Sequence, residues 1–193
     1  NVIFMDNHDM SRFYSMVNED FDKYKSGMVL LLTMRGIPQL YYGTEILMKN
    51  YSNPDGLVRS DFPGGWAGDK EDKFTAAGRT AKENEAFNFV RTLANYRKNN
   101  PALQTGKLMQ FVPENGIYTY FRYQPDNAAD ATQAKTVMVV VNTEDTAKQL
   151  ETSRFAERME KASSATNVIT GEKINTLKTI GVPAKTTLVL ELN

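Results

Sequence analysis

The chain has 193 residues, of which 41% are hydrophobic and 24% are charged, an ordinary composition for a globular protein. Lys plus Arg and Asp plus Glu number 23 each, so no charge excess favours nucleic acid or an acidic membrane surface as a partner. The longest apolar stretch, residues 28–34, is too short to span a bilayer, the absence of cysteine excludes disulfides and thiolate metal sites, and a single histidine excludes a multi-histidine metal site.

The start of the sequence resembles the interior of a longer protein. It opens on a strand-like run, Val2 to Met5, without an initiator methionine or a signal-peptide pattern. We therefore expect a fragment, or a chain whose beginning is not shown. Localisation signals would lie in the missing part, so the sequence predicts no compartment.

Strand and helix patterns alternate in the first hundred residues. Val2 to Met5 predicts a buried parallel strand, and polar residues 18–20 predict the start of a helix. The apolar face of that helix repeats every three or four residues and comprises Phe21, Tyr24, Met28, Leu31 and Leu32. Gly36 and Pro38 end the helix, and Ile37 to Tyr42 predicts a second strand. This order is that of a right-handed strand–helix–strand unit.

A long connection and a second helix follow. Residues 49–79 are rich in Gly, Asp, Asn and Pro, and loops of this length are often functional. Thr80, with Glu83 three residues later, predicts a capping box at the start of a helix that runs to Asn99.

The pattern changes to β after Pro101. Residues 117–123, 137–141 and 187–192 read as short strands, and residues 124–135 read as a hairpin connection. Evenly spaced short strands favour an antiparallel sandwich. We therefore predict an α/β region at 1–103 and an all-β domain at 104–193.

Polar residues directly follow the first predicted strand, where α/β barrels carry catalytic groups. Asn7, His8 and Asp9 stand there together. Three interpretations remain open from the residues alone. The cluster can be a hydrogen-bonded turn, His8 can pair with Asp6 or Asp9 on a metal, or a carboxylate can act as an acid or electrostatic group in a cleft.

Two sequence motifs resemble one enzyme family. Residues 4–9, Phe-Met-Asp-Asn-His-Asp, resemble the strand-seven signature F-x-x-N-H-D of the α-amylase superfamily, glycoside hydrolase family 13. Residues 36–45 resemble its strand-eight signature, G-x-P-x-x-Y-Y-G-x-E. The resemblance implies the last two strand–helix units of a (β/α)8 barrel, followed by the family's C-terminal β domain, and is closest to neopullulanase and cyclomaltodextrinase.

The resemblance also assigns roles to the strand-end residues. Asp9 matches the aspartate that stabilises the transition state, and His8 matches the histidine that hydrogen-bonds the same sugar. Such groups suit an oxocarbenium-like transition state, because hydrogen bonds to ring hydroxyls strengthen as positive charge develops. We expect Asn7 to shape the turn.

Further sugar contacts are implied in the long connection. Asp55 and Arg59 have the Asp-x-x-x-Arg spacing that holds a sugar in the neopullulanase branch, although a solvated surface ion pair is an equal alternative. Trp66 can stack on a sugar or plug the loop against the barrel. Six residues of the second signature are interpreted as mainly structural: Gly36, Pro38, Tyr41, Tyr42, Gly43 and Glu45.

The catalytic nucleophile and the acid/base carboxylate of a retaining glycosidase are absent from the sequence, because the family supplies them from strands four and five. We expect this chain to need the remainder of the barrel and to hydrolyse nothing by itself. No cofactor or metal site is expected in it, while calcium can be held elsewhere in a full-length enzyme.

The leading functional hypothesis is a retaining hydrolase of α-1,4, or also α-1,6, glucosidic bonds in starch, pullulan or cyclodextrin. A transglycosylase or α-glucosidase of the same superfamily is the second. The third is a non-catalytic carbohydrate-binding module built on the β domain, which tight glucan binding by residues 104–193 alone would favour.

Overall fold

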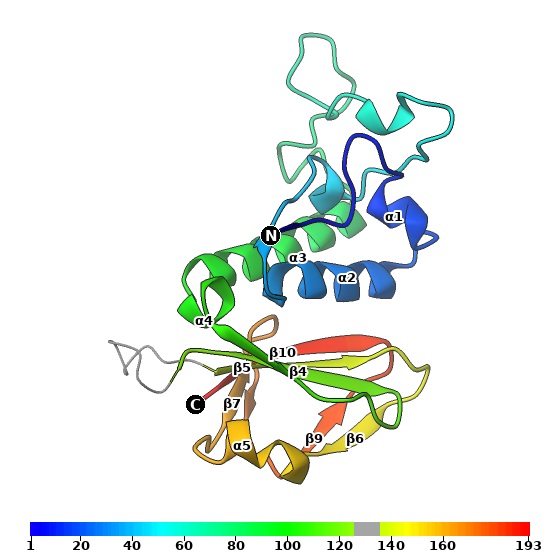
Figure 1. Ribbon diagram of the computed structural model, residues 1–193. Coiled ribbons are helices and arrows are strands. Elements are labelled where there is room, and N and C mark those ends of the chain that lie inside the picture. The colour runs from blue at the N-terminus through cyan, green and yellow to red at the C-terminus, as the bar shows by residue number, and fades with distance from the viewer. Residues whose placement is uncertain (126–135) are drawn as a thin grey trace.

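The computed structural model describes residues 1–125 and 136–193. A mainly helical first part lies against a C-terminal β domain (Figure 1). The first part holds β1 (Val2–Ile3), α1 (Phe13–Met16), α2 (Phe21–Thr33), β2 (Ile37–Pro38) and α3 (Ala81–Lys98), with short 3-10 helices η1 (Thr44–Ile46) and η2 (Leu57–Arg59). The helix α4 (Pro101–Gln104) leads into the β domain, so the boundary that we predict between residues 103 and 104 falls within it. No helix in the described part of the chain is long and apolar enough to cross a membrane.

The two short strands of the first part run parallel, as the strand–helix–strand pattern predicts. Val2 pairs with Ile37, and Ile3 pairs with Pro38. Both strands are shorter than predicted, and the expectation of a buried strand is wrong here, since the side chains of Val2 and Ile37 are 54% and 66% exposed. The physical reason is that neither strand has a further neighbour within the described residues.

The helices begin where their capping residues predict. Asp20 caps α2 by accepting hydrogen bonds from the backbone N–H groups of Asp22 and Lys23. Thr80 and Glu83 form the predicted capping box of α3, since each side chain accepts from the other residue's backbone N–H. The predicted apolar face of α2 is buried apart from Phe21, which is partly exposed.

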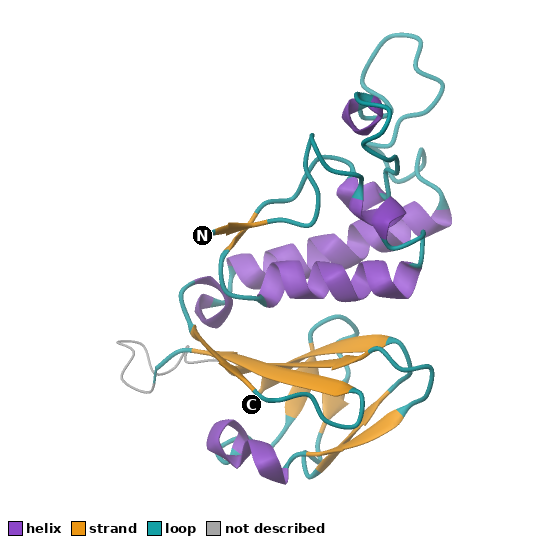
Figure 2. Cartoon of the chain, turned by 45° about the vertical axis from the view of Figure 1, so that its right-hand side comes forward, coloured by secondary structure: helices purple, strands orange, loops and turns teal. Residues whose placement is uncertain are grey.

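The C-terminal part is the predicted antiparallel sandwich (Figure 2). Its larger sheet has the order β3-β4-β5-β10-β7-β8, and a second sheet pairs β6 with β9. The strands are β3 (Lys107–Gln110), β4 (Ile117–Tyr123), β5 (Thr136–Asn142), β6 (Lys148–Glu151), β7 (Ala165–Asn167), β8 (Lys173–Ile174), β9 (Thr179–Val182) and β10 (Thr186–Leu192), with η4 (Ser153–Phe155) and α5 (Ala156–Met159) after β6. The antiparallel pairing of β4 with β5 fits the predicted hairpin, while residues 126–135 of its connection lie outside the described residues.

Alternation along the central strands produces two separate cores. One face of the large sheet presents Tyr120 and Val139 to helices α2 and α3, while the other presents Phe121 and Met138 to the second sheet. The β domain is therefore packed directly against the helices that support the two parallel strands.

Arginine side chains connect these layers. Arg122 of β4, fully buried, donates from Nη1 to the carbonyl of Thr33 at 2.7 Å and from Nη2 to Gly106 at 3.0 Å. Arg97 of α3 donates to the carbonyls of Leu32 and Gly36 at 3.0 and 2.6 Å. Both thus bind carbonyls at the C-terminal end of α2, which have no partner within the helix and carry its negative dipole.

Candidate functional site

A tight turn follows β1 and presents two polar side chains to solvent. The Asn7 side-chain oxygen accepts hydrogen bonds from the backbone N–H of Asp9 at 2.9 Å and of Met10 at 3.0 Å. The side chains of His8 and Asp9 are 66% and 65% exposed, with His8 Nε2 lying 3.2 Å from Asp9 Oδ2. The prediction that Asn7 shapes this turn is confirmed.

Arg59 joins this turn to the long connection. Its Nη2 lies 3.0 Å from Asp9 Oδ1 and 3.5 Å from Asp55 Oδ1, and its Nε donates to the His8 carbonyl at 2.9 Å. Residues more than fifty positions apart in the chain therefore meet at the carboxyl end of β1. We call His8, Asp9, Asp55 and Arg59 the site cluster.

The Asp55–Arg59 pair is thus more than a local surface ion pair, because the same guanidinium also binds the strand-end carboxylate. The planar guanidinium of Arg59 therefore lies between the Asp9 and Asp55 carboxylates and contacts both. The second carboxylate oxygen of Asp9, Oδ2, faces His8. Because the Asp9 side chain is exposed, there is room beside it for a ligand hydroxyl.

Trp66 stands apart from the site cluster. Its side chain is 74% exposed, and its backbone N–H donates to the Asp69 carboxylate at 3.0 Å. Among the described residues, no ring contact or ion pair joins it to the cluster. Both interpretations of Trp66, a ring that stacks on a sugar and a plug against the barrel, stay predictions, because the described residues contain only two strands of that barrel.

The loop that carries Trp66 is nevertheless firmly attached at its far end. Lys73, only 8% exposed, pairs with Glu83 at 2.8 Å and with Glu71 at 3.2 Å. Because Glu83 also belongs to the capping box, the loop is tied to the first turn of α3. The rings of Phe62 and Phe74 pack with centroids 4.4 Å apart.

Asp6, the first acid of the polar cluster, points into the protein instead. It is 2% exposed and accepts hydrogen bonds from the backbone N–H of Phe13 at 2.8 Å and from the Thr44 hydroxyl at 3.0 Å. Burial raises the pKa of Asp6, while these hydrogen bonds and Arg12 oppose the rise. The metal pairing of His8 with Asp6 is therefore wrong, and the described residues contain no group of three metal-ligating side chains of the His, Cys, Asp or Glu type.

Arg12 is a site-forming residue that the sequence reasoning missed. It is 1% exposed, and its guanidinium carbon lies 4.2 Å from the Tyr41 ring centroid and 4.7 Å from that of Tyr42. Its Nη1 also donates to the carbonyl of Tyr42. The sequence shows an arginine shortly after the polar cluster, but nothing in its spacing indicates that it is buried against two rings.

Glu45 lies beside a pocket on the same side of the molecule. The pocket has a volume of about 540 Å³, and its lining is partly aromatic: Tyr42, Glu45, Asp61, Phe62, Lys73, Phe74, Arg79 and Phe87. Burial raises the pKa of Glu45, against the opposing effect of backbone hydrogen bonds and Arg12. This half-buried carboxyl lines the pocket and has no described contact with the site cluster.

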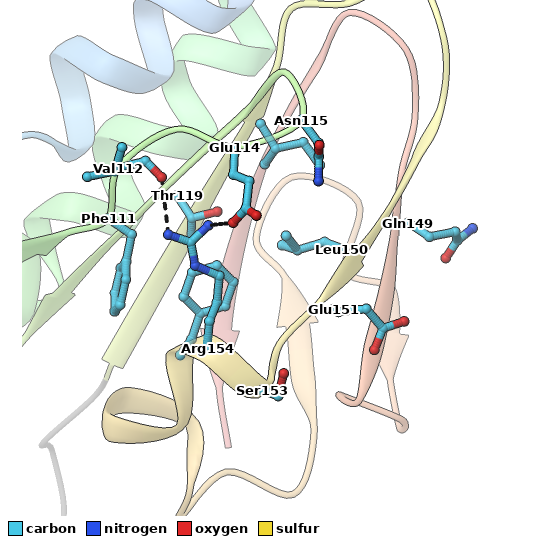
Figure 3. Close-up of a pocket in the computed structure, with 12 residues that line it drawn as sticks. Phe111, Val112, Glu114, Asn115, Thr119, Gln149, Leu150, Glu151, Ser153 and Arg154 are labelled. Carbon is cyan, nitrogen blue, oxygen red and sulfur yellow. Dashed lines mark hydrogen bonds and ion pairs between the residues drawn. The ribbon is translucent and has the colours of Figure 1, made fainter.

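The β domain has a pocket of its own, of about 300 Å³, shown in Figure 3. Arg154 pairs there with Glu114 and donates to the carbonyl of Val112. None of the signature residues lines this pocket. The predicted chemistry is therefore confined to the end of β1 and its adjoining loops.

Comparison with known proteins finds a family match for two parts of the chain. Residues 1–72 match the family model "Alpha amylase, catalytic domain", and residues 108–191 match "Cyclo-malto-dextrinase C-terminal domain". The chain is 35% identical over 122 residues to a cyclomaltodextrin glucanotransferase of Niallia circulans, covering 63% of this chain and 14% of the relative. It is 33% identical over 128 residues to an α-amylase of Niallia circulans, covering 66% of this chain and 21% of the relative.

A solved structure shows the same fold. The α-amylase from Geobacillus thermoleovorans, complexed with acarbose, superposes with a TM-score of 0.72 at 19% identity and covers 100% of this chain and 38% of that one. The chain thus spans much less than the length of its relatives. Each of its two parts matches a domain of these enzymes, and the two matched ranges together cover most of the chain. The chain therefore belongs to the α-amylase superfamily, glycoside hydrolase family 13, and carries the end of its catalytic barrel and its C-terminal β domain.

Proposed function

We propose that this chain supplies one wall of the substrate cleft of an enzyme that hydrolyses α-glucosidic bonds in starch, pullulan or cyclodextrin. The observation that carries the proposal is the placement of His8 and Asp9. Both side chains are exposed at the carboxyl end of a parallel strand, and Arg59 orients the Asp9 carboxylate. That end of an α/β barrel is where catalytic groups lie in such enzymes.

Each member of the site cluster then has a distinct task. Asp9 stabilises the developing positive charge and accepts a hydrogen bond from the scissile sugar, while His8 donates to the same sugar. Asp55 and Arg59 hold the next sugar on the non-reducing side. Trp66, an exposed indole on a loop fixed at its base, stacks on a sugar face further along the chain.

The bond-breaking groups lie outside this sequence. A retaining glycosidase needs a nucleophilic and an acid/base carboxylate about 5 Å apart. The resemblance places that pair on strands four and five of the barrel, and neither strand is part of this sequence. The remainder of the barrel must contribute both groups, and no cofactor held by these residues enters the reaction.

Substitution of Asp9 by Asn in the full-length enzyme tests the proposal. The amide keeps the shape but removes the charge, so kcat on soluble starch should fall roughly 10²–10³-fold. Asp145→Asn is the matched control, since Asp145 is also exposed and ion-paired, but to Lys185 in the β domain. An Asp9→Asn enzyme with nearly unchanged kcat would contradict the role of Asp9.

A second candidate is a transglycosylase, favoured by the glucanotransferases among the relatives. The same site cluster would serve both reactions, because they share the glycosyl-enzyme intermediate and differ in the acceptor. Product analysis on maltooligosaccharides separates them, since hydrolysis gives only shorter sugars and transfer gives longer or cyclic ones. Retention of glucan by residues 104–193 alone would instead favour the binding-module alternative.

A further inference from the structure

Two adjacent tyrosines donate hydrogen bonds to the backbone on both sides of Arg59. The Tyr42 hydroxyl donates to the carbonyl of Ser60 at 2.7 Å, and the Tyr41 hydroxyl donates to that of Val58 at 3.4 Å. These carbonyls belong to the residues directly after and directly before Arg59. The interpretation of Tyr42 as mainly structural is therefore incomplete, because its partly exposed side chain binds the loop that carries Arg59.

The rings of Tyr41 and Tyr42 are held in turn by contacts with Arg12. Their centroids lie 4.6 Å apart, and the buried guanidinium of Arg12 stacks against both. The same guanidinium donates to the backbone carbonyl of Tyr42. Arginine on an aromatic face is held by charge–quadrupole attraction and by its flat shape, so the rings have little freedom to turn.

Arg59 needs such support from its surroundings. It ends a 3-10 helix of only three residues, and Gly56 before that helix has a φ of +93°. Its side chain is 46% exposed, and exposed ion pairs are weak because ordering two flexible side chains costs entropy. A hydrogen bond that fixes the backbone next to Arg59 reduces the number of directions its guanidinium can take.

We propose that Tyr42 is a positioning residue, whose hydroxyl holds Arg59 against Asp9 and thereby sets the direction of the Asp9 carboxylate. The effect passes from the Arg12-stacked ring to the Ser60 carbonyl, then through Arg59 to Asp9. Tyr41 contributes less, because its hydrogen bond is longer. The inference rests on the proposed function, since it assumes that Asp9 and Arg59 contact the sugar.

Tyr42→Phe in the full-length enzyme removes the hydroxyl and keeps the ring on Arg12. We expect kcat/KM on soluble starch to fall about fivefold, the size of one lost hydrogen bond, with an unchanged unfolding temperature. Tyr51→Phe is the matched control, because its hydroxyl bonds the Ser15 carbonyl at 3.3 Å, away from Arg59, and it should retain full activity. Equal activity of the Tyr42 variant and the control would overturn the proposal.

A double substitution distinguishes positioning from a general structural effect. In an Arg59→Ala background, Tyr42→Phe should change kcat/KM by less than about twofold, because the group that Tyr42 orients is gone. If the fold-losses in kcat/KM of the two single variants multiply in the double variant, Tyr42 does not act through Arg59, and the proposal fails.

The crystal structure of the Tyr42→Phe enzyme separates this proposal from the proposed function. We expect the Arg59 guanidinium to leave Asp9 in that structure; finding it still in place would overturn the positioning role whatever the activity. A different outcome is that Arg59 moves in the Tyr42→Phe structure while the separate variants Asp9→Asn and Arg59→Ala keep full turnover. In that case the function proposed for the site cluster fails and the positioning contact stands.

Discussion

Arginines in two regions of this molecule differ in their burial and in the groups they bind. At the interface between the helices and the β domain, Arg122 is fully buried and binds only backbone carbonyls among its described hydrogen bonds. Burial, followed by the neighbouring Arg97, lowers the pKa of Arg122 to about 10. At the site cluster, Arg59 is half exposed and binds two carboxylates. The buried arginine joins the end of α2 to the β domain, whereas the exposed one remains accessible to a ligand.

The comparison leads to a general expectation. Substitutions at the interface should lower stability, because a buried acceptor without its donor cannot turn to water. Substitutions in the site cluster should lower turnover and leave stability almost unchanged, because solvent replaces what is lost.

Arg122→Met should have the largest effect on stability. The carbonyls of Thr33, Gly106 and Lys107 lose their donor together, and we expect a loss of about 2–4 kcal/mol in the free energy of unfolding. Urea denaturation followed by far-ultraviolet circular dichroism measures it. Arg35→Met is the control, since Arg35 is exposed, and a similar small loss in both variants would remove the distinction between the two regions.

Glu83→Gln should have an intermediate effect that depends on pH. Burial by itself raises the pKa of Glu83, but hydrogen bonds from Lys73 and Thr80 outweigh it, so the pKa lies below its ordinary value of 4.5. Ionised Glu83 therefore stabilises the fold fully above pH 4.5, and this stabilisation disappears as the pH falls through the lower folded-state pKa.

Gln still completes the capping box, so the substitution isolates the ion pair with Lys73. We expect a loss of about 1 kcal/mol at pH 7, which shrinks toward zero in acid. Unfolding temperatures of both proteins between pH 3 and pH 7 measure this, with Glu85→Gln as an exposed control on the same helix. A difference that is independent of pH would rule out the ion pair as its source.

Arg59→Ala should have the smallest effect on stability. Its ion pairs are solvent-exposed, so the free energy of unfolding should change by less than about 0.5 kcal/mol, although activity on starch decreases. Parallel denaturation and activity measurements on one preparation give both quantities. A large loss of stability would show that the site cluster also holds the fold together.

Much of the fold could be predicted from local patterns. The helix starts could be predicted because capping is local in sequence. The side chains of Asp20, Thr80 and Glu83 accept hydrogen bonds from backbone N–H groups at most three residues away. Alternation along residues 117–123 similarly indicated two opposite faces of one strand. The strand ends were less predictable, because pairing depends on neighbours: the segments 2–5 and 37–42 are apolar, yet only two residues of each pair.

The family signatures, and with them the candidates His8, Asp9, Asp55 and Arg59, could be identified without coordinates, because residue type and spacing are properties of the chain alone. Three features followed only from the folded structure: Arg59 contacts Asp9 as well as Asp55, Asp6 turns inward, and Arg12 is buried against two tyrosine rings. The physical reason is distance along the chain. Caps and periodicity act over a few residues, whereas burial and ion pairing depend on which distant segments the fold brings together.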